Sequence, residues 1–264
     1  MKELKFAVCT VAYNEEDYIG ACIDNWKGLV DKHLVLLSSK PWYGSRGESD
    51  KTYNIAKKRG ADVVVGRWES EAAQRNWGLA RLYDYDYVLI VDPDEFYTKA
   101  DQEKIFKELL NPIRNSYDPE RYAPAFQCNK MVTYWKTMDY VLSRDTHRPI
   151  IAADPRQLYV NEYRNFWYLE GINRDQLDFY GRLDIICYHM SWVRSDEKIL
   201  EKINSYSHAN IIKPGWYEDI WLKWEPGNQV NVRPYGNDDA IAQYSPAPQE
   251  IQDLINNSRK VEKY

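Results

Sequence analysis

Two carboxylates that close the most apolar run of the chain are the first candidates for chemistry. Residues 87–91 are Tyr-Val-Leu-Ile-Val, and Asp92, Pro93, Asp94 and Glu95 follow them directly. Paired carboxylates beyond the end of a buried strand are suited to hold a hard divalent cation on a phosphorylated ligand. Asp and Pro also favour ordinary turns, but acidic residues this close repel one another unless a cation or a basic group lies near. We therefore expect a binding site at Asp92 and Asp94.

A helix that precedes this strand carries polar side chains near its N-terminus. We expect the helix at residues 70–82, with Gln74, Arg75 and Asn76 close to its start. A helix N-terminus favours anions and polar ligands. Arg75 also stands four residues after Glu71, which is the spacing of a surface ion pair. Taken alone, this helix is therefore more typical of a solvated face than of a site.

The first hundred residues alternate between strand-like runs and helix-like patterns. Strands are expected at 6–11, 34–37, 61–65 and 87–91, and helices after Asn14, at 49–59 and at 70–82. This alternation is typical of an α/β fold with a mostly parallel central sheet and helices on both faces. Right-handed crossovers bring the loops after parallel strands to one edge of the sheet, where ligands bind in open α/β sheets. The candidate loops are 12–15, 38–47, 66–71 and 92–95.

Two of the expected helices have clear start signals. Asn14 is suited to cap the first helix, and Ser195 is suited to cap another at 195–207. Both helices have acidic residues in the first turn and an apolar stripe at helical spacing. Between them, residues 120–192 mix short strands with aromatic loops. We expect the tail from Lys213 to wrap back over the body of one domain.

The composition limits the classes of protein to which the chain can belong. Hydrophobic residues make up 44% and aromatic residues 14% of the 264 residues, which is enough apolar surface to exclude disorder. The net charge of −5 argues against nucleic-acid binding, which needs a basic face. No apolar run approaches the roughly 20 residues of a membrane-spanning helix, so we expect peripheral membrane contact at most. The four cysteines are widely spaced and no signal-peptide pattern is present, so we expect reduced, buried thiols in a cytoplasmic protein.

Three segments of the first hundred residues form a specific combination in a fixed order. They are Thr10-Val-Ala-Tyr-Asn-Glu-Glu, Ala72-Ala-Gln-Arg-Asn-Trp-Gly and Tyr87-Val-Leu-Ile-Val-Asp-Pro-Asp-Glu. Together they resemble the family 2 glycosyltransferases, whose nucleotide-sugar-binding fold is called GT-A, over residues 5–98. They are most similar to the bacterial branch that adds sugars to lipopolysaccharide cores. The resemblance implies one GT-A-like domain over 1–264, with a nucleotide-sugar half at 1–98, an acceptor and metal-completing half at 99–212 and a C-terminal wrap at 213–264.

The resemblance implies roles for individual residues of the first half. The residues that it places around the nucleoside are Thr10, Ala12, Asn14 and Glu15. The residues that it places under the donor are Gln74, Arg75 and Asn76. It also implies that Asp92 and Asp94 hold a Mn²⁺ or Mg²⁺ ion on the diphosphate of the donor.

One segment departs from the family pattern. The family usually has an acidic segment after the second strand, where it contacts the nucleoside. Residues 37–42 of this chain are Leu-Ser-Ser-Lys-Pro-Trp instead. Ser38 or Ser39 is therefore left to hydrogen-bond the base or the ribose.

The second half offers a third metal ligand and a catalytic base. Residues 181–189 resemble the strand that ends in a metal-binding histidine in many GT-A enzymes, which implies a ligand role for His189. An inverting transferase also needs a carboxylate to remove the proton from the acceptor hydroxyl. The candidates are Glu170, Asp175 and Asp184, with Glu162 as a further alternative. Glu170 is preferred because it follows the aromatic residues 166–168, although a surface carboxylate is an equally good interpretation of each candidate.

Tryptophans are frequent in the half expected to hold the acceptor. They are Trp135, Trp167, Trp192, Trp216, Trp221 and Trp224. Aromatic rings stack on the apolar faces of sugars, but many such rings belong to a core. We expect a minority of them to contact substrate.

The hypothesis that follows is a metal-dependent, inverting glycosyltransferase of the hexosyltransferase type. It would move a sugar from a nucleoside-diphosphate sugar to a hydroxyl of a glycan or glycolipid. One alternative is a sugar-1-phosphate nucleotidyltransferase, but those enzymes open with a Gly-rich, Arg-containing loop where this chain has residues 12–15. Another is a non-catalytic carbohydrate-binding protein, which would not need the nucleotide-side segments.

Overall fold

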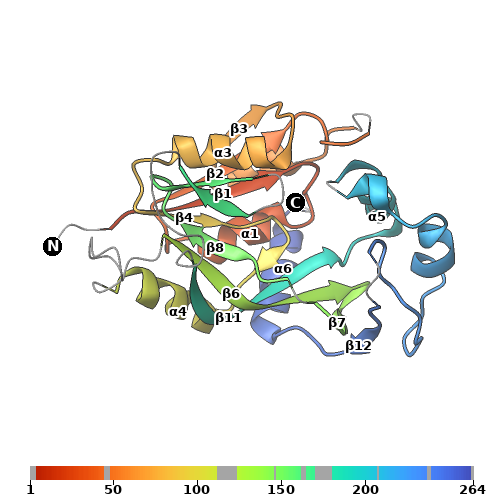
Figure 1. Ribbon diagram of the computed structural model, residues 1–264. Helices are drawn as coiled ribbons and strands as arrows, with labels where there is room; N and C mark the ends of the chain where they lie inside the picture. Colours follow the sequence, from red (N-terminus) through yellow and green to blue (C-terminus); the bar gives the residue numbers. More distant parts are fainter. Residues whose placement is uncertain are drawn as a thin grey trace.

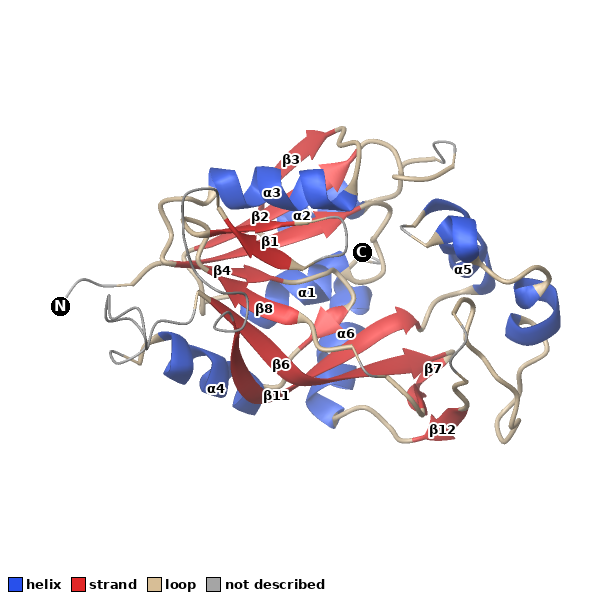
Figure 2. Ribbon diagram, viewed as in Figure 1, coloured by secondary structure: helices blue, strands red, loops and turns tan. Residues whose placement is uncertain are grey.

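The computed structural model describes residues 4–44, 48–111, 124–145, 147–161, 165–169, 180–206, 208–236 and 239–262 of the chain. These residues form a large mixed sheet with helices packed on both of its faces (Figure 1). Figure 2 shows the strands as a twisted layer between the helices. The expected α/β fold with a central sheet is therefore confirmed.

The first half of the sheet is parallel. Its strands lie in the order β3, β2, β1, β4, and each neighbouring pair is parallel. The strands are β1 (Phe6–Ala12), β2 (Lys32–Ser38), β3 (Asp62–Gly66) and β4 (Tyr87–Ile90). The connecting helices are α1 (Ile19–Trp26), α2 (Thr52–Lys58) and α3 (Glu71–Arg81). This is the alternation that the hydrophobic pattern predicts.

Antiparallel strands extend the sheet beyond β4. β8 pairs with both β4 and β6, and β7 and β12 continue to the far edge. β11 runs parallel to β6 and antiparallel to the short β5, while β9 and β10 form a separate pair. The strands are β5 (Glu95–Phe96), β6 (Ala125–Trp135), β7 (Thr137–Leu142), β8 (Ile150–Ala153), β9 (Leu158–Val160), β10 (Phe166–Tyr168), β11 (Tyr180–Trp192) and β12 (Ala242–Tyr244). The helices are α4 (Lys99–Leu109), α5 (Asp196–Ser205), η2 (Ala209–Ile211), η3 (Tyr217–Trp221) and α6 (Gln249–Val261).

β11 brings the second half of the chain to the carboxyl end of β4. His189 of β11 lies opposite Glu95 of β5, and the Met190 N–H donates a hydrogen bond of 2.8 Å to the Asp94 carbonyl. The chain then continues into α5, which stands at the end of the sheet toward which β1 and β2 run (Figure 1). Residues almost a hundred positions apart in sequence therefore meet at one edge.

The sheet has a separate apolar layer on each face. All seven residues of β1 are buried, and alternate side chains of a strand point to opposite faces. Phe6 and Val8 pack in a cluster with residues of α1 and α4. Cys9 and Val11 pack in another cluster with residues of α3, such as Leu79. The packing on both faces fixes the position of α3, and with it Arg75.

The two predicted helix caps have different outcomes. The Ser195 side chain accepts a hydrogen bond from the Lys198 N–H and caps α5, as predicted. The prediction that Asn14 caps the first helix is wrong, because α1 begins at Ile19. Asn14 instead has a φ of 52°, a left-handed conformation that asparagine tolerates, and its side chain donates to Glu201 of α5. Asn14 therefore ties the loop after β1 to a distant helix.

Five of the six tryptophans of the second half form a core. Trp135 of β6 is at its centre, and its ring centroid lies 4.9 Å from that of Trp221 and 5.9 Å from that of Trp216. Trp192 and Trp224 belong to the same cluster. Trp167 differs, since it lies on β10 and is 39% exposed. The aromatic excess of the second half is therefore largely a packing layer beneath α5 and η3.

The C-terminal helix returns to the first half of the chain. Ile251 and Ile255 of α6 are buried in a cluster with Tyr18 and Ala21 at the start of α1. Arg59, which follows α2, forms an ion pair of 3.5 Å with Glu262 at the end of α6. The tail therefore packs against the helices that cover the parallel half of the sheet.

Two further expectations concern the cysteines and the membrane. All four cysteines are buried and carry free thiols, as expected. Burial raises the pKa of Cys9 and of Cys128 to about 12, so both remain thiols at neutral pH. Among the helices of the described residues, none has the length and apolar character needed to span a membrane.

The close packing of α3 on the sheet predicts that Gly78→Ala destabilises the protein. A Cβ at Gly78 would lie 2.9 Å from Leu36 Cδ1 and would also contact Cys9 Sγ. Such overpacking costs about 1–3 kcal/mol, whereas alanine otherwise gains about 1 kcal/mol over glycine in a helix. We expect a net fall in the free energy of unfolding, measured by urea denaturation. Ala80→Gly on the exposed side of α3 is the control, with an expected cost of about 1 kcal/mol; a stabilised Gly78→Ala protein would contradict the packing.

Candidate active site

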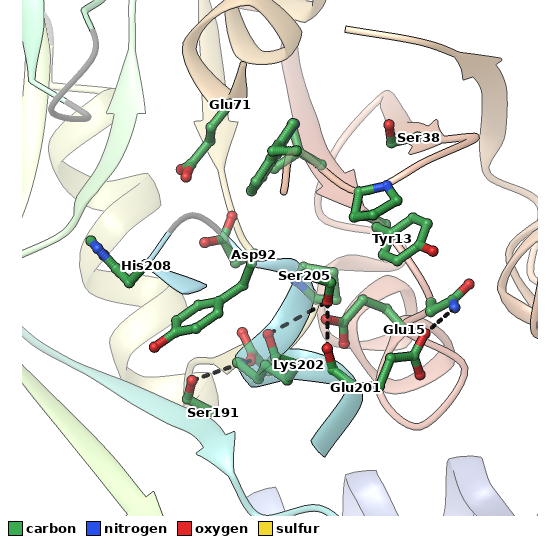
Figure 3. A pocket seen from close by; sticks show the side chains of 18 of the residues that line it. Tyr13, Glu15, Ser38, Glu71, Asp92, Ser191, Glu201, Lys202, Ser205 and His208 are labelled. Atoms are coloured by element: carbon green, nitrogen blue, oxygen red, sulfur yellow. Dashed lines mark hydrogen bonds and ion pairs between the residues drawn. The ribbon is translucent and has the colours of Figure 1, made fainter. Parts of the chain in front are cut away.

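A cavity opens at the edge of the sheet where the parallel strands end. Its walls come from the loops after β1, β2 and β4, from α3, from the end of β11 and from α5 with the turn that follows it. Tyr13, Glu15, Asp92 and Lys202 reach it from these different segments (Figure 3). All four loops expected at this edge contribute, the third of them through Glu71.

Arg194 joins three of these segments. Its Nη2 donates a hydrogen bond of 2.8 Å to Glu15 Oε2 and one of 2.9 Å to Asp94 Oδ2. The side chain is only 3% exposed, and its guanidinium lies over the Tyr18 ring at 5.0 Å. Burial opposes the charge of Arg194, but Glu15 and Asp94 outweigh it and hold the pKa above its usual value. Arg194 is therefore a fixed cation in the wall of the cavity.

Asp94 is paired with several groups of the cavity. Besides Arg194, its Oδ2 accepts a hydrogen bond of 3.3 Å from Lys202 Nζ, and its Oδ1 lies 3.6 Å from His189 Nε2. Burial alone would raise the pKa of Asp94. Lys202, His189 and Arg194 outweigh it and hold that pKa well below its ordinary value. Asp94 is therefore an anion throughout the physiological range.

Asp92 faces a different cation. Its Oδ1 accepts a hydrogen bond of 2.6 Å from Arg75 Nη2, and its backbone N–H donates to Glu95 Oε2 at 3.1 Å. Arg75 also donates from Nε and Nη2 to Glu71 Oε1, at 3.0 and 2.9 Å. The expected pair between Glu71 and Arg75 is present. Because Arg75 is 3% exposed, this pair belongs to the site and not to a solvated helix face.

The orientation of His189 follows from a chain of hydrogen bonds. The Thr133 hydroxyl donates to Asp145, and Thr133 Oγ1 lies 3.0 Å from His189 Nδ1. A hydroxyl that gives its proton to a carboxylate must accept from the imidazole, which places the proton of His189 on Nδ1. Burial and the charge of Lys202 lower the pKa of His189, although Asp94 opposes them. A neutral His189 thus directs the lone pair of Nε2 toward Asp94 and the cavity.

The expected three-ligand metal site is not formed by Asp92, Asp94 and His189. Within the described ranges, no group of three or more His, Cys, Asp or Glu side chains is arranged to hold a metal ion. Asp92 faces Arg75, as described above. Asp94 Oδ1 and His189 Nε2 lie 3.6 Å apart, and each has a lone pair available. This pair suits a two-ligand site for a cation that binds oxygen and nitrogen ligands.

The structure places six of the residues expected around the donor in the wall of the cavity. They are Ala12, Asn14, Glu15, Ser38, Arg75 and Asp92. Ser38 is the last residue of β2, and its hydroxyl donates a hydrogen bond of 2.6 Å to the Lys40 carbonyl. The departure from the acidic family segment therefore leaves a short, internally bonded loop at this wall.

Three other residues expected at the donor lie outside the cavity. Thr10 is fully buried, and its hydroxyl lies 2.9 Å from Nε2 of His33, whose pKa burial lowers to about 3. Gln74 donates a hydrogen bond of 2.7 Å to the Leu36 carbonyl and accepts one of 3.1 Å from Trp42 Nε1.

Asn76 forms two hydrogen bonds of 2.7 Å with the backbone of Val160, one as donor and one as acceptor. The sequence predicts that these residues contact the donor directly. In the structure, Gln74 and Asn76 instead position neighbouring segments. Gln74 holds the loop after β2, and Asn76 holds β9.

The candidate catalytic bases are only partly covered by the structure. Glu170, Asp175 and the alternative Glu162 lie outside the described residues. Asp184 is described, and it does not line the cavity: its side chain on β11 is 92% exposed and lies 3.8 Å from Lys104 of α4. A position this far from the cavity does not suit the base, so Asp184 is corrected to a surface residue.

The cations of the second half are site residues that the sequence-based prediction missed. Arg194, Lys198 and Lys202 all line the cavity. Lys198 Nζ lies 3.1 Å from Glu16 Oε1 and 3.4 Å from Asp50 Oδ2, so it ties α5 to two loops of the first half. The signal in the sequence was the spacing of four between these cations, directly after the strand that ends near His189.

The chain is similar to Rickettsia proteins that are named uncharacterized glycosyltransferases. The protein from Rickettsia typhi is 24% identical over 218 residues, which cover 80% of this chain and 69% of the relative. The protein from Rickettsia prowazekii is 23% identical over 233 residues, with coverages of 80% and 69%. No protein-family model matches the chain. The relatives bear out the prediction of a glycosyltransferase. They do not support the finer assignment to the lipopolysaccharide-core branch.

Solved structures show weaker similarity. The crystal structure of glucosyl-3-phosphoglycerate synthase from Mycobacterium tuberculosis with Mn²⁺, UDP and glucosyl-3-phosphoglycerate is 22% identical, with a TM-score of 0.36. The match covers 50% of this chain and 44% of the synthase, so this chain spans less than half of its length. The crystal structure of a mycobacterial protein is 17% identical, with a TM-score of 0.45. The match covers 80% of this chain and 78% of the mycobacterial chain.

The environment of Glu15 predicts a specific pH dependence of stability. Burial and the charge of Asp94 raise the pKa of Glu15 to about 7, although Arg194 opposes them. The folded state therefore holds a proton that the unfolded state has lost, and stability falls as the pH rises from about 4.5 through 7. Glu15→Gln removes this titration, so the variant should gain about 2 kcal/mol relative to the wild type between pH 5 and pH 8. Urea denaturation at both pH values measures it, and a constant difference would contradict the assignment.

Proposed function

We propose that the chain transfers a sugar from a nucleoside-diphosphate sugar to a hydroxyl group of an acceptor. The observation that carries the proposal is the cavity beyond β4, where Arg194 is a fixed cation beside the carboxylate Asp94. A diphosphate needs fixed positive charge, and ligands of open α/β sheets bind outside the carboxyl ends of the strands. The names of the Rickettsia relatives support the same reaction class.

The nucleoside is proposed to lie between the loops after β1 and β2. Tyr13 contributes to one wall of this part of the cavity, and Ser38 and Trp42 contribute to the other. The Trp42 ring is held by its hydrogen bond to Gln74, so it offers a fixed aromatic face to a base. The diphosphate then points toward α5 and the loop after β4.

A divalent cation is proposed to bind between Asp94 and His189. A carboxylate oxygen and a neutral imidazole nitrogen suit Mn²⁺, and the oxygens also suit Mg²⁺. When bound, the ion would supply positive charge that stabilises the diphosphate as it leaves. Asp92 would act through Arg75, which it holds in the wall of the cavity.

The acceptor is proposed to bind in a second cavity on the other side of Arg75. This cavity shares Arg75 with the first one, and Gln127, Asp145, His147 and Arg148 contribute to its wall. A shared wall brings an acceptor hydroxyl close to a sugar held in the first cavity. The glycan or glycolipid acceptor that the family resemblance implies would enter here.

Transfer with inversion is proposed to take place in one displacement. The acceptor oxygen forms a bond to the anomeric carbon while the bond from that carbon to the diphosphate oxygen breaks. The electron pair of that bond leaves with the nucleoside diphosphate, and the hydroxyl proton moves to a carboxylate. Glu170, Asp175 and the alternative Glu162 stay candidates for this base, and Asp145 joins them because it lines the second cavity.

The proposed function predicts that a nucleoside diphosphate stabilises the folded protein. A ligand bound at 100 times its dissociation constant adds about 2.7 kcal/mol of stability and raises the melting temperature by several degrees. UDP, GDP and their sugars, each with and without Mn²⁺, would be compared by thermal shift. The best donor should then release its nucleoside diphosphate when a glycan acceptor is present. No shift with any nucleotide, or binding of nucleotide without turnover of any donor, would contradict a transferase.

A matched pair of variants connects this assay to the cavity. Asp94→Asn keeps the shape of the side chain but removes the charge that holds Arg194 and Lys202, so we expect about a hundredfold loss of transfer. Asp219→Asn removes an exposed carboxylate elsewhere on the surface and should leave transfer unchanged. Equal activities of the two variants would exclude Asp94 from the reaction.

A further inference from the structure

Lys202 has a position that the proposed metal does not account for. It lies on α5 with its Nζ 2.8 Å from Ser191 Oγ and 3.3 Å from Asp94 Oδ2 (Figure 3). Its side chain is 16% exposed and lines the cavity. The ammonium group is therefore held by two partners from other elements while it still faces the space where a ligand would bind.

The two oxygens of the Asp94 carboxylate face different groups. Oδ1 lies beside His189 Nε2, where a divalent ion is proposed to bind. Oδ2 accepts hydrogen bonds from Arg194 and Lys202. The carboxylate therefore separates a metal-binding side from a side that already holds two cations of the protein.

These cations differ in how fully they are neutralised. Arg194 is shared between Glu15 and Asp94 and is nearly inaccessible. Lys202 forms an ion pair with Asp94, which already accepts a hydrogen bond from Arg194. A compact ammonium group has three N–H donors, one of which bonds to Ser191 Oγ, and it is well suited to donate a further hydrogen bond to a phosphate oxygen.

From this geometry we propose that Lys202 binds the diphosphate of the donor directly, as a cation of the protein that acts alongside any divalent ion. This inference rests on the proposed function. It adds a specific residue that the family segments do not contain. When the bond between the anomeric carbon and the diphosphate oxygen breaks, the electron pair stays on that oxygen, and Lys202 stabilises the added negative charge. The hydroxyl proton still moves to the carboxylate base.

The consequence is that diphosphate binding should not depend entirely on a metal. Titration calorimetry with UDP, GDP and inorganic pyrophosphate, in EDTA and then in Mn²⁺, measures this directly. Pyrophosphate isolates the diphosphate from the choice of base. We expect the wild type to bind in EDTA, and Lys202→Met to bind at least about tenfold more weakly in both buffers. Each lost charged hydrogen bond is worth about this factor.

Two further variants keep the test decisive. Lys202→Arg retains the charge and should bind within about threefold of the wild type, which separates loss of charge from loss of fold. Lys104→Met removes an exposed lysine of α4 that lies against Asp184, and it should bind as the wild type does. Melting temperatures of all four proteins confirm that each is folded.

The outcomes separate this inference from the proposed function. Binding that requires Mn²⁺ and is unchanged or tighter in Lys202→Met would overturn the role of Lys202, and the transferase would stand. Failure of every probe to bind the wild type in both buffers would overturn the proposed function and this inference together. Metal-free binding that Lys202→Met weakens, and Lys202→Arg preserves, would support the inference.

Discussion

The site depends on one buried cation, Arg194, which is bonded to two carboxylates from different parts of the chain. Glu15 follows β1, Asp94 follows β4, and Arg194 lies between β11 and α5. Removal of one member of such a buried network leaves an unpaired charge, which commonly costs about 3–5 kcal/mol. The same bonds fix the direction in which α5 leaves the sheet, because Arg194 directly precedes its cap. The position of every α5 side chain in the cavity therefore follows from this interaction.

The remaining contacts of α5 reinforce this placement. Lys198 reaches Glu16 and Asp50, and Glu201 accepts from Asn14. Each contact joins the second half of the chain to a loop at the carboxyl edge of the parallel sheet. Because the loops and the helix hold one another, the cavity between them has a defined shape before a ligand enters. Such preorganisation lowers the entropic cost of ligand binding.

Much of the first half of the fold could be predicted from the sequence, for local reasons. The apolar run of β1 is buried on both faces, as central strands of parallel sheets are. In the second half, the predicted cap Ser195 also holds, because its bond to the Lys198 N–H spans only three residues. The loops at the carboxyl edge, including the one with Asp92 and Asp94, follow from the handedness of the crossovers. These features need no knowledge of distant contacts.

The parts that were missed depend on partners far away in the sequence. Asn14 could not be predicted as a tie to Glu201, because 187 residues separate the two. Gln74 and Asn76 bond to the backbones of β2 and β9, and a polar residue of that kind has the same appearance in sequence as a ligand contact. The sequence suggested a metal as the partner of Asp92, whereas in the structure its partner is Arg75. This pairing also depends on tertiary packing. The role of Lys202 can be inferred only from the fold, because β11 places α5 at the end of β4.

Arg194 and Lys202 surround the position that we propose for the donor diphosphate at the end of β4. A crystal structure of the protein with a bound nucleoside diphosphate would test this placement. We expect diphosphate oxygens within about 2.7–3.2 Å of Lys202 Nζ, with the nucleoside between the loops after β1 and β2. A diphosphate bound in the second cavity beyond Arg75, or one that does not contact α5, would contradict it.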